Sequence, residues 1–199
     1  HVADNIIIAT RTGVEETDIT LFLVPKSTNG MSQTLLKTIA SDRQSEVILK
    51  DVHLPALAII GEVNKGWDTI KKVIKCGAIG KCAEMLGGSQ KVLDMTVEYA
   101  KQRVQFGRPI GTFQAIQHHC ADMASDVEGS RYVTYKAAWR ISEGDPADQE
   151  VAVAKAWVSD AYRRICAKGH QVHGAIGFTK EHNMQLFSRR AKEAELAFG

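Results

Sequence analysis

The sequence predicts an α+β fold, mostly α, in which a partial β-domain is followed by an antiparallel four-helix bundle. Before Gly66 the apolar residues are largely β-branched and form short runs between Gly, Asn, Asp and Ser, as in strands. After Gly66 they recur every three or four residues over long stretches, as in amphipathic helices. We therefore expect two domains, a β part over 1–64 and a helical part over 65–199.

Three segments before Gly66 are predicted to be strands. They are DNIIIATRT, DITLFLVPKS and RQSEVILKDVHLPALAII, which begin at residues 4, 18 and 43. In the second segment Ile19, Leu21 and Leu23 alternate with other residues, which is typical of a half-buried antiparallel strand. Because the strands are few and have no obvious beginning, we expect this β-domain to be incomplete.

The first helix is predicted from about Gly66 to Lys101. Its apolar face comprises Ile70, Ile74, Ala78, Cys82, Leu86, Leu93 and Val97. Gly87 and Gly88 interrupt the helix, and each costs about 1 kcal/mol relative to alanine. We expect close packing against a neighbouring backbone to offset that cost.

Capping residues divide the rest of the chain into three further helices. The expected boundaries are Thr112 to Gly144, Asp145-Pro146 to His173-Gly174, and Thr179 to the end of MQLFSRRAKEAELAF. The loops between them are short, which favours antiparallel neighbours. No strand is expected beyond residue 70.

Composition excludes several classes of protein. The chain is 44% hydrophobic and 24% charged with a net charge of +2, so nothing indicates nucleic acid or an anionic membrane as partner. Its longest apolar runs, such as LPALAII, are too short to cross a bilayer. No signal peptide is recognisable, and the four cysteines form no CxxC pair. We expect buried, reduced thiols and a cytoplasmic location.

A metal site is not predicted either. Cys166, His170 and His173 fall on one helical face, at spacings that zinc could use. No fourth ligand stands at a motif spacing, so a core thiol with interface histidines is favoured. The usual nucleophile and phosphate-loop motifs, GxSxG, GxGxxG and the Walker loop, are absent from the sequence.

Two segments carry the chemistry that a nucleotide would need. RVQFGRPIGTFQAIQH, from Arg103, places a positive charge, an aromatic ring and an amide close together, and QVHGAIGFTKEH begins at Gln171. Together they resemble the acyl-CoA dehydrogenase family, flavoproteins that oxidise an acyl-CoA thioester to its enoyl-CoA. The resemblance covers essentially the whole chain, because LFLVP and LKDVHLPALAIIGEVNKGW look like the end of that family's middle β-domain.

The resemblance implies contacts to FAD, part of them with the FAD of a neighbouring subunit. Arg103 and Phe106 match positions that meet the neighbour's cofactor, and Gln105 and Gln114 match positions near it. Phe113 stands where relatives often have a polar residue. The segment Gln171, Val172, His173, Gly174 and Ala175 matches a turn along the adenine and pyrophosphate side. The implied partners are an acyl-CoA substrate and either further copies of this chain or another acyl-CoA dehydrogenase subunit.

The sequence departs from the family at the catalytic base. The two positions where relatives carry the proton-abstracting glutamate fall at Phe198 and Gly77, and neither residue can accept a proton. Ala78 stands where relatives often have an arginine. Glu193 and Glu195 lie nearby in sequence, but we expect them to be solvated helix residues. The base therefore has no assigned residue.

Three functions stay open at this point. The chain is the carboxy-terminal portion of an FAD-dependent acyl-CoA dehydrogenase, a non-catalytic or half-site subunit of a heteromeric one, or a helical scaffold that has lost flavin binding. The family's amino-terminal helical domain and the first part of its β-domain are missing from the sequence. We therefore expect the chain alone to bind FAD poorly and to be inactive. The acyl chain that would be oxidised cannot be identified.

Overall fold

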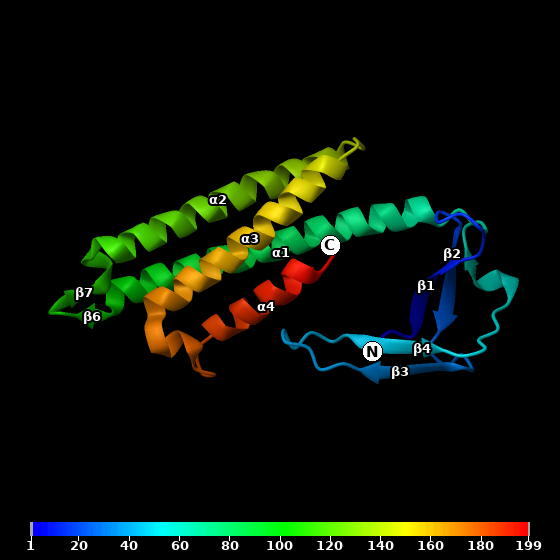
Figure 1. Cartoon of the computed structure of the whole chain (residues 1–199), viewed down its shortest axis with the longest axis horizontal. Coiled ribbons are helices and arrows are strands. Elements are labelled where there is room, and N and C mark those ends of the chain that lie inside the picture. Colours follow the sequence, from blue (N-terminus) through cyan, green and yellow to red (C-terminus); the bar gives the residue numbers. More distant parts are fainter. Residues whose placement is uncertain (1, 199) are drawn as a thin grey trace. The chain divides into compact units, whose positions relative to one another are not determined.

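The structure is a computed structural model that describes residues 2–198. It confirms the predicted fold class, with small antiparallel sheets followed by four long helices (Figure 1). The chain divides into two compact units, residues 1–74 and 75–199, and the division falls within the first helix. The domain boundary at 64/65 stays a prediction.

The first unit contains one three-stranded and one two-stranded antiparallel sheet. Its strands are β1 (Asn5–Arg11), β2 (Ile19–Pro25), β3 (Met31–Leu35), β4 (Ser45–Leu49) and β5 (Ile59–Ile60). The larger sheet has the order β1-β2-β5, with Ile8 opposite Phe22, and the smaller pairs β3 with β4. The prediction did not include β3, because MSQTL holds only two large apolar residues.

The alternation predicted for β2 is confirmed at Ile19 and Leu21, which are half-buried and buried, and was wrong at Leu23. Leu23 is exposed, whereas Thr20 and Val24 are buried on the opposite face of the strand from Leu21. Thr20 can be buried because its hydroxyl accepts a hydrogen bond from the Asn64 backbone N–H at 2.9 Å. A polar residue with a tertiary partner is therefore buried on the face that the alternation assigned to solvent.

The second unit is the antiparallel bundle. Its helices are α1 (Trp67–Gln102, which starts in the first unit), α2 (Gln114–Ser142), α3 (Asp148–His173) and α4 (Met184–Leu196). Helix α3 packs against both α2 and α4 (Figure 1). The largest fully buried side chains of this unit include Met85, Met123, Ile165 and Met184. One continuous apolar core thus joins the four helices.

Close packing at the glycines of α1 differs from the expectation. Gly88 lies against the phenol of Tyr162, where an added Cβ would collide with the ring, and Gly87 faces open space. The partner is therefore a side chain rather than a backbone. Glycine at 88 makes room for a large aromatic residue of α3.

The three predicted helix starts after α1 were wrong. They were Thr112, Asp145 and Thr179, and the helices begin instead at Gln114, Asp148 and Met184. The hydroxyl of Thr112 donates to the Pro109 carbonyl (2.7 Å), and the Asp145 carboxylate accepts from Arg140 (2.6 Å). Each is engaged locally and is not free to cap a helix.

A small hairpin also contradicts the expectation that no strand follows residue 70. Strands β6 (Val104–Gln105) and β7 (Arg108–Pro109) pair antiparallel between α1 and α2. Their two connecting residues, Phe106 and Gly107, both have positive φ, at 53° and 78°. This is the geometry of a type I′ turn, which matches the twist of the strands it joins.

Candidate functional site

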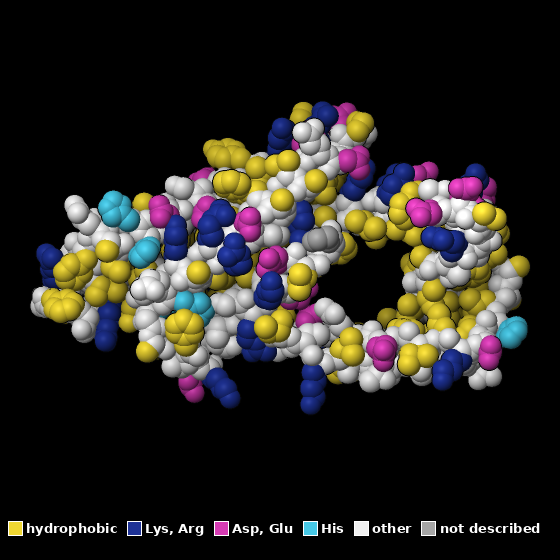
Figure 2. Space-filling model, viewed as in Figure 1, with side chains coloured by type: hydrophobic (Ala, Val, Ile, Leu, Met, Phe, Trp, Pro, Cys, Tyr) yellow, Lys and Arg dark blue, Asp and Glu magenta, His cyan; other side chains and the backbone are white. Residues whose placement is uncertain are grey.

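The β6–β7 hairpin fixes the position of Arg103 and projects Phe106. The Arg103 N–H donates to the Tyr99 carbonyl at the end of α1, and the Arg103 carbonyl accepts from the Ile110 N–H, both at 2.8 Å. The Arg103 side chain is exposed, and Phe106 is 92% exposed at the tip. Figure 2 shows hydrophobic and basic side chains side by side at this end of the bundle.

An aromatic and guanidinium cluster surrounds the tip. The rings of Phe106 and Phe113 meet edge to face at 6.0 Å, and the Arg108 guanidinium lies 4.2 Å from the Phe113 ring centroid. The sequence prediction did not include Arg108, although it stands in the same Gly-Arg-Pro run. The cluster therefore offers the Arg108 guanidinium beside two rings, and the exposed Arg103 stands at the base of the same hairpin.

The two predicted glutamines of this segment are placed differently. Gln114 is the first residue of α2 and is exposed. Gln105 is also exposed, but its amide donates to the carbonyl of its neighbour Val104 at 2.9 Å. Among the described residues, the Gln114 amide, unlike that of Gln105, has no local hydrogen bond to break before it contacts a ligand.

The second predicted segment forms the end of α3. Gln171, Gly174 and Ala175 are exposed, whereas Val172 and His173 are only 5% and 4% exposed. Gly174 ends the helix with φ of 65°, a conformation that favours glycine. This segment therefore presents one amide side chain and bare backbone to its surroundings.

Both predicted segments lie at the same end of the bundle, because α1 and α3 run in the same direction (Figure 1). The His173 ring stacks on Tyr99 of α1 with centroids 4.5 Å apart, which ties the two segments together. An open pocket of about 500 Å³ lies beside this contact. Its lining consists of Lys91, Asp94, Met95, Glu98, Tyr99, Gln102, His173 and His182.

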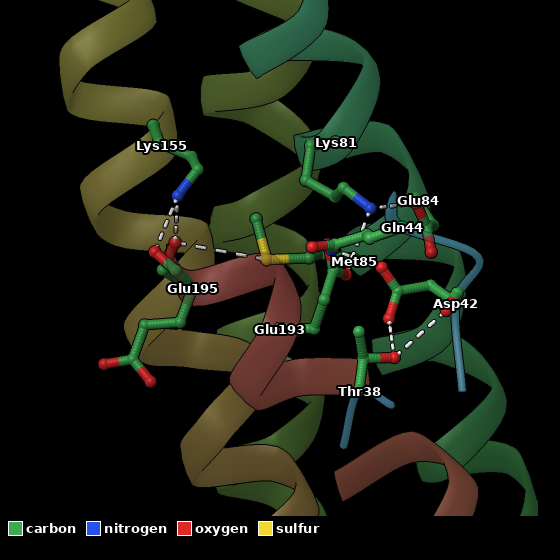
Figure 3. Close-up of polar contacts among 10 residues, drawn as sticks. Thr38, Asp42, Gln44, Lys81, Glu84, Met85, Lys155, Glu193 and Glu195 are labelled. Carbon is green, nitrogen blue, oxygen red and sulfur yellow. Dashed lines mark hydrogen bonds and ion pairs between the residues drawn. The ribbon is translucent and has the colours of Figure 1, made fainter. Parts of the chain in front are cut away.

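Two lysines, Lys155 of α3 and Lys81 of α1, contact residues at the carboxy-terminal end of α4 (Figure 3). The buried Lys155 ammonium donates to the Glu195 carbonyl (3.0 Å) and to Ser159 Oγ (3.3 Å), and burial lowers the pKa of Lys155. Lys81 forms ion pairs with Glu84 (2.9 Å) and Glu193 (3.2 Å). The sequence analysis missed Lys155, which could have been noticed as a charge on the apolar face of α3.

Phe198, just beyond α4, lies on Gly77 of α1. A Cβ added to Gly77 would stand 2.5 Å from Cε1 of the Phe198 ring. These two positions, 121 residues apart in the sequence, are thus in contact in the structure. The contact is made by an aromatic ring.

The thiol and imidazoles on α3 are engaged in ordinary contacts. His170 Nε2 hydrogen-bonds Ser188 Oγ, and His173 Nδ1 donates to the Gly169 carbonyl at 2.8 Å. Burial raises the pKa of the Cys166 thiol to about 12. Within residues 2–198 no three His, Cys, Asp or Glu side chains are arranged to hold a metal ion.

The thiols are only in part as expected. All four cysteines are free, and Cys82 and Cys166 are buried, but Cys76 is exposed and Cys120 half-buried.

No helix within residues 2–198 is both long enough and apolar enough to cross a bilayer.

Comparison with known proteins accounts for this arrangement. A sequence profile described as "Acyl-CoA dehydrogenase, C-terminal domain" matches residues 64–199. The chain belongs to the acyl-CoA dehydrogenase family. A probable acyl-CoA dehydrogenase of Bacillus subtilis, YngJ, is 35% identical over 184 residues, which cover 91% of this chain and 48% of the relative.

Solved acyl-CoA dehydrogenase structures agree. Butyryl-CoA dehydrogenase from Megasphaera elsdenii superposes with a TM-score of 0.93 at 32% identity, covering 99% of this chain and 53% of that one. A chain of the ChsE4–ChsE5 complex from Mycobacterium tuberculosis superposes with a TM-score of 0.90 at 33% identity, covering 100% of this chain and 52% of that one. This chain therefore spans about half the length of the relatives it matches.

In acyl-CoA dehydrogenase terms, Phe198 and Gly77 are the two expected base positions, and the structure brings them together without a carboxylate. The two acidic residues that shortly precede Phe198 in the sequence, Glu193 and Glu195, are already paired. Glu193 is half-buried against Lys81, so the expectation that it is solvated was wrong, and the Glu195 carboxylate pairs with Lys192 at 3.0 Å.

Proposed function

We propose that this chain is part of an acyl-CoA dehydrogenase subunit that contributes the β6–β7 end of its bundle to an FAD shared with a neighbouring subunit. In this proposal the chain supplies no catalytic base. The assembly would oxidise an acyl-CoA thioester to its enoyl-CoA, and the bound flavin would supply the hydride-accepting chemistry. The chain's own residues would bind and orient the cofactor.

The conformation of Phe106 carries the proposal. A bulky residue with positive φ is a genuine outlier, and left-handed backbone costs an L-residue about 1–2 kcal/mol. At 92% exposure the ring recovers little of that by burial. A strained, exposed aromatic ring that contacts a second ring covered by the Arg108 guanidinium is expected where a ligand uses it.

The groups present fit a dinucleotide. Arg103 and Arg108 are exposed and can pair with pyrophosphate oxygens, which guanidinium groups recognise in a bidentate manner. Phe106 offers a flat apolar face, and Gln114 offers an amide. At the end of α3 the bare backbone of Gly174 permits a close approach.

The contact between Phe198 and Gly77 favours a half-site subunit over a complete dehydrogenase. General-base catalysis is typically worth about 10²–10⁴-fold in rate, so a chain without the base needs a partner that has it. The partner in this proposal is another acyl-CoA dehydrogenase subunit, and one similar structure is itself described as a complex of two proteins. The exposed free thiol of Cys76 supports a reducing, cytoplasmic setting.

The test is the flavin content of the assembly purified with its co-expressed genomic neighbours. Arg103→Ala removes a charge-assisted contact worth about 1.5–3 kcal/mol, so flavin affinity should fall about tenfold or more. Lys101→Ala, an exposed charge two residues earlier, is the matched control and should leave flavin bound. Equal flavin content in both variants would support the remaining alternative, a scaffold that no longer binds flavin.

A further inference from the structure

Three histidines meet where α3 ends and α4 begins. The rings of His173 and His182 lie 4.8 Å apart, and the opposite neighbour of His173 is the stacked ring of Tyr99. His170 stacks on Phe178 of the intervening 3-10 helix η3 (Gly174–Phe178), with centroids 4.4 Å apart. His173 also belongs to the segment predicted to contact the flavin, but neither that role nor the missing base explains why the three rings pack together.

His182 acts as a hydrogen-bond acceptor for the start of α4. Its Nδ1 accepts from the Met184 backbone N–H at 3.2 Å. Met184 is the first residue of α4, and the first N–H groups of a helix have no partner within it. Only neutral imidazole has a nitrogen that accepts, because both nitrogens of the protonated ring are donors. Proton uptake at His182 therefore removes this contact.

In His170 and His173 the existing hydrogen bonds fix which ring nitrogen would take up a second proton. His173 Nδ1 already donates to the Gly169 carbonyl, so the added proton goes to Nε2 of a ring that touches His182. The Ser188 hydroxyl donates to the Met184 carbonyl (3.3 Å) and so accepts from His170 Nε2–H. His170 Nδ1 is left buried without a hydrogen-bond partner among the described residues.

The surroundings favour the neutral form of the buried rings. Three elements bring titratable groups close to the cluster. Helix α1 lines the adjacent pocket with Lys91, Asp94, Glu98 and Tyr99. Helix α3 contributes the Cys166 thiol near Ser188, and the turn before α4 carries the exposed Lys180 and Glu181. Asp94 accepts from Gln90, and Glu98 from Gln102. Despite these carboxylates, burial lowers the pKa of His170 and of His173, and the proximity of His182 lowers both further.

We infer that the three imidazoles form a pH-sensitive clamp on the amino end of α4. When they are neutral, His182 satisfies the first N–H of the helix while His173 and His170 stack on their aromatic partners. Proton uptake removes the acceptor and places positive charge beside the positive end of the α4 dipole. Protonation of the cluster therefore loosens the first turn of α4. All contacts of this clamp are made within the chain itself.

Hydrogen exchange of the purified protein, followed by NMR at backbone amides, tests the clamp. Between about pH 7.5 and 5.5 the Met184 amide should lose about fivefold of its protection, after correction for intrinsic exchange, which is the effect of losing one helix cap. In His182→Asn the amide oxygen still accepts but does not titrate, so the loss should vanish. His118→Asn, on the exposed surface of α2, should behave as wild type.

Two results would overturn the inference. One is a Met184 protection factor that does not change with pH in the wild type, or one that falls equally in His182→Asn. The other needs no variant, since imidazole nitrogen shifts report the tautomer directly. A hydrogen found on Nδ1 of His182 near pH 7.5 would contradict the acceptor role.

Discussion

Replacing Phe106 by Asn should stabilise the protein while weakening flavin binding. Asn tolerates the left-handed conformation, and Asn-Gly is the preferred pair for a type I′ turn. Relief of strain at φ of 53° should gain about 1–2 kcal/mol, because that is the cost of left-handed backbone for an L-residue. The same change removes the edge-to-face contact with Phe113.

The lost contact sets the net size of the effect. A well-packed aromatic pair contributes about 0.5–1.5 kcal/mol, and the lower end applies here because the Phe106 ring is 92% exposed. The expected net gain is therefore about 0.5–1.5 kcal/mol in the free energy of unfolding. For a chain of this length that corresponds to a rise of about 1–6 °C in Tm.

Urea and thermal unfolding measure the gain, and flavin content of the co-purified assembly measures the loss. Phe106→Ala is the matched control, since it removes the ring but keeps a residue that disfavours positive φ. It should lose flavin in the same way without becoming more stable. A clear loss of stability in Phe106→Asn would refute the reasoning, because it would show that the ring is kept for packing within the fold.

Two further predictions concern the interior. Gly77→Ala should destabilise the protein by about 1 kcal/mol, the lower end for overpacking, because the Phe198 ring that the new Cβ displaces is half-exposed. In a Phe198→Ala background the same change should gain up to about 1 kcal/mol of helix propensity. Equal effects in both backgrounds, measured by urea unfolding, would show that the ring does not lie there. The pKa values of His170 and His173 are lowered in the folded protein, so as the pH falls the unfolded chain binds protons first. The free energy of unfolding should therefore be constant above about pH 6.5 and fall below that pH. The fall should be at most about 1.4 kcal/mol per pH unit for each histidine. Replacing both with Gln should flatten that fall, and replacing the exposed His118 should not.

Much of the fold could be predicted because periodicity is a local property. The change from β-branched runs to a helical period placed the start of the first helix within one residue of Trp67, and Gly174 ended α3 as expected. The resemblance of RVQFGRPIGTFQ and QVHGAIGFTKEH to acyl-CoA dehydrogenases identified the family, which the comparisons confirm. The helix boundaries and the family motifs both depend only on which residue types follow one another, and that order can be read directly from the sequence.

Other features needed the tertiary structure because they depend on which residues compete for one place. Thr112 and Asp145 are good helix caps by residue type, but in the structure their side chains hydrogen-bond the Pro109 carbonyl and Arg140 instead. The strain at Phe106 depends on a hairpin too short to show any periodicity.

The interior contacts belong to the same class. No local pattern could show that Phe198 lies on Gly77, or that the ammonium of Lys155 holds the end of α4. These contacts join residues 121 and 40 positions apart, and only the packing of the helices brings them together. The order of the residues thus determined the family and the helices, whereas packing decided that the Phe198 ring lies on Gly77.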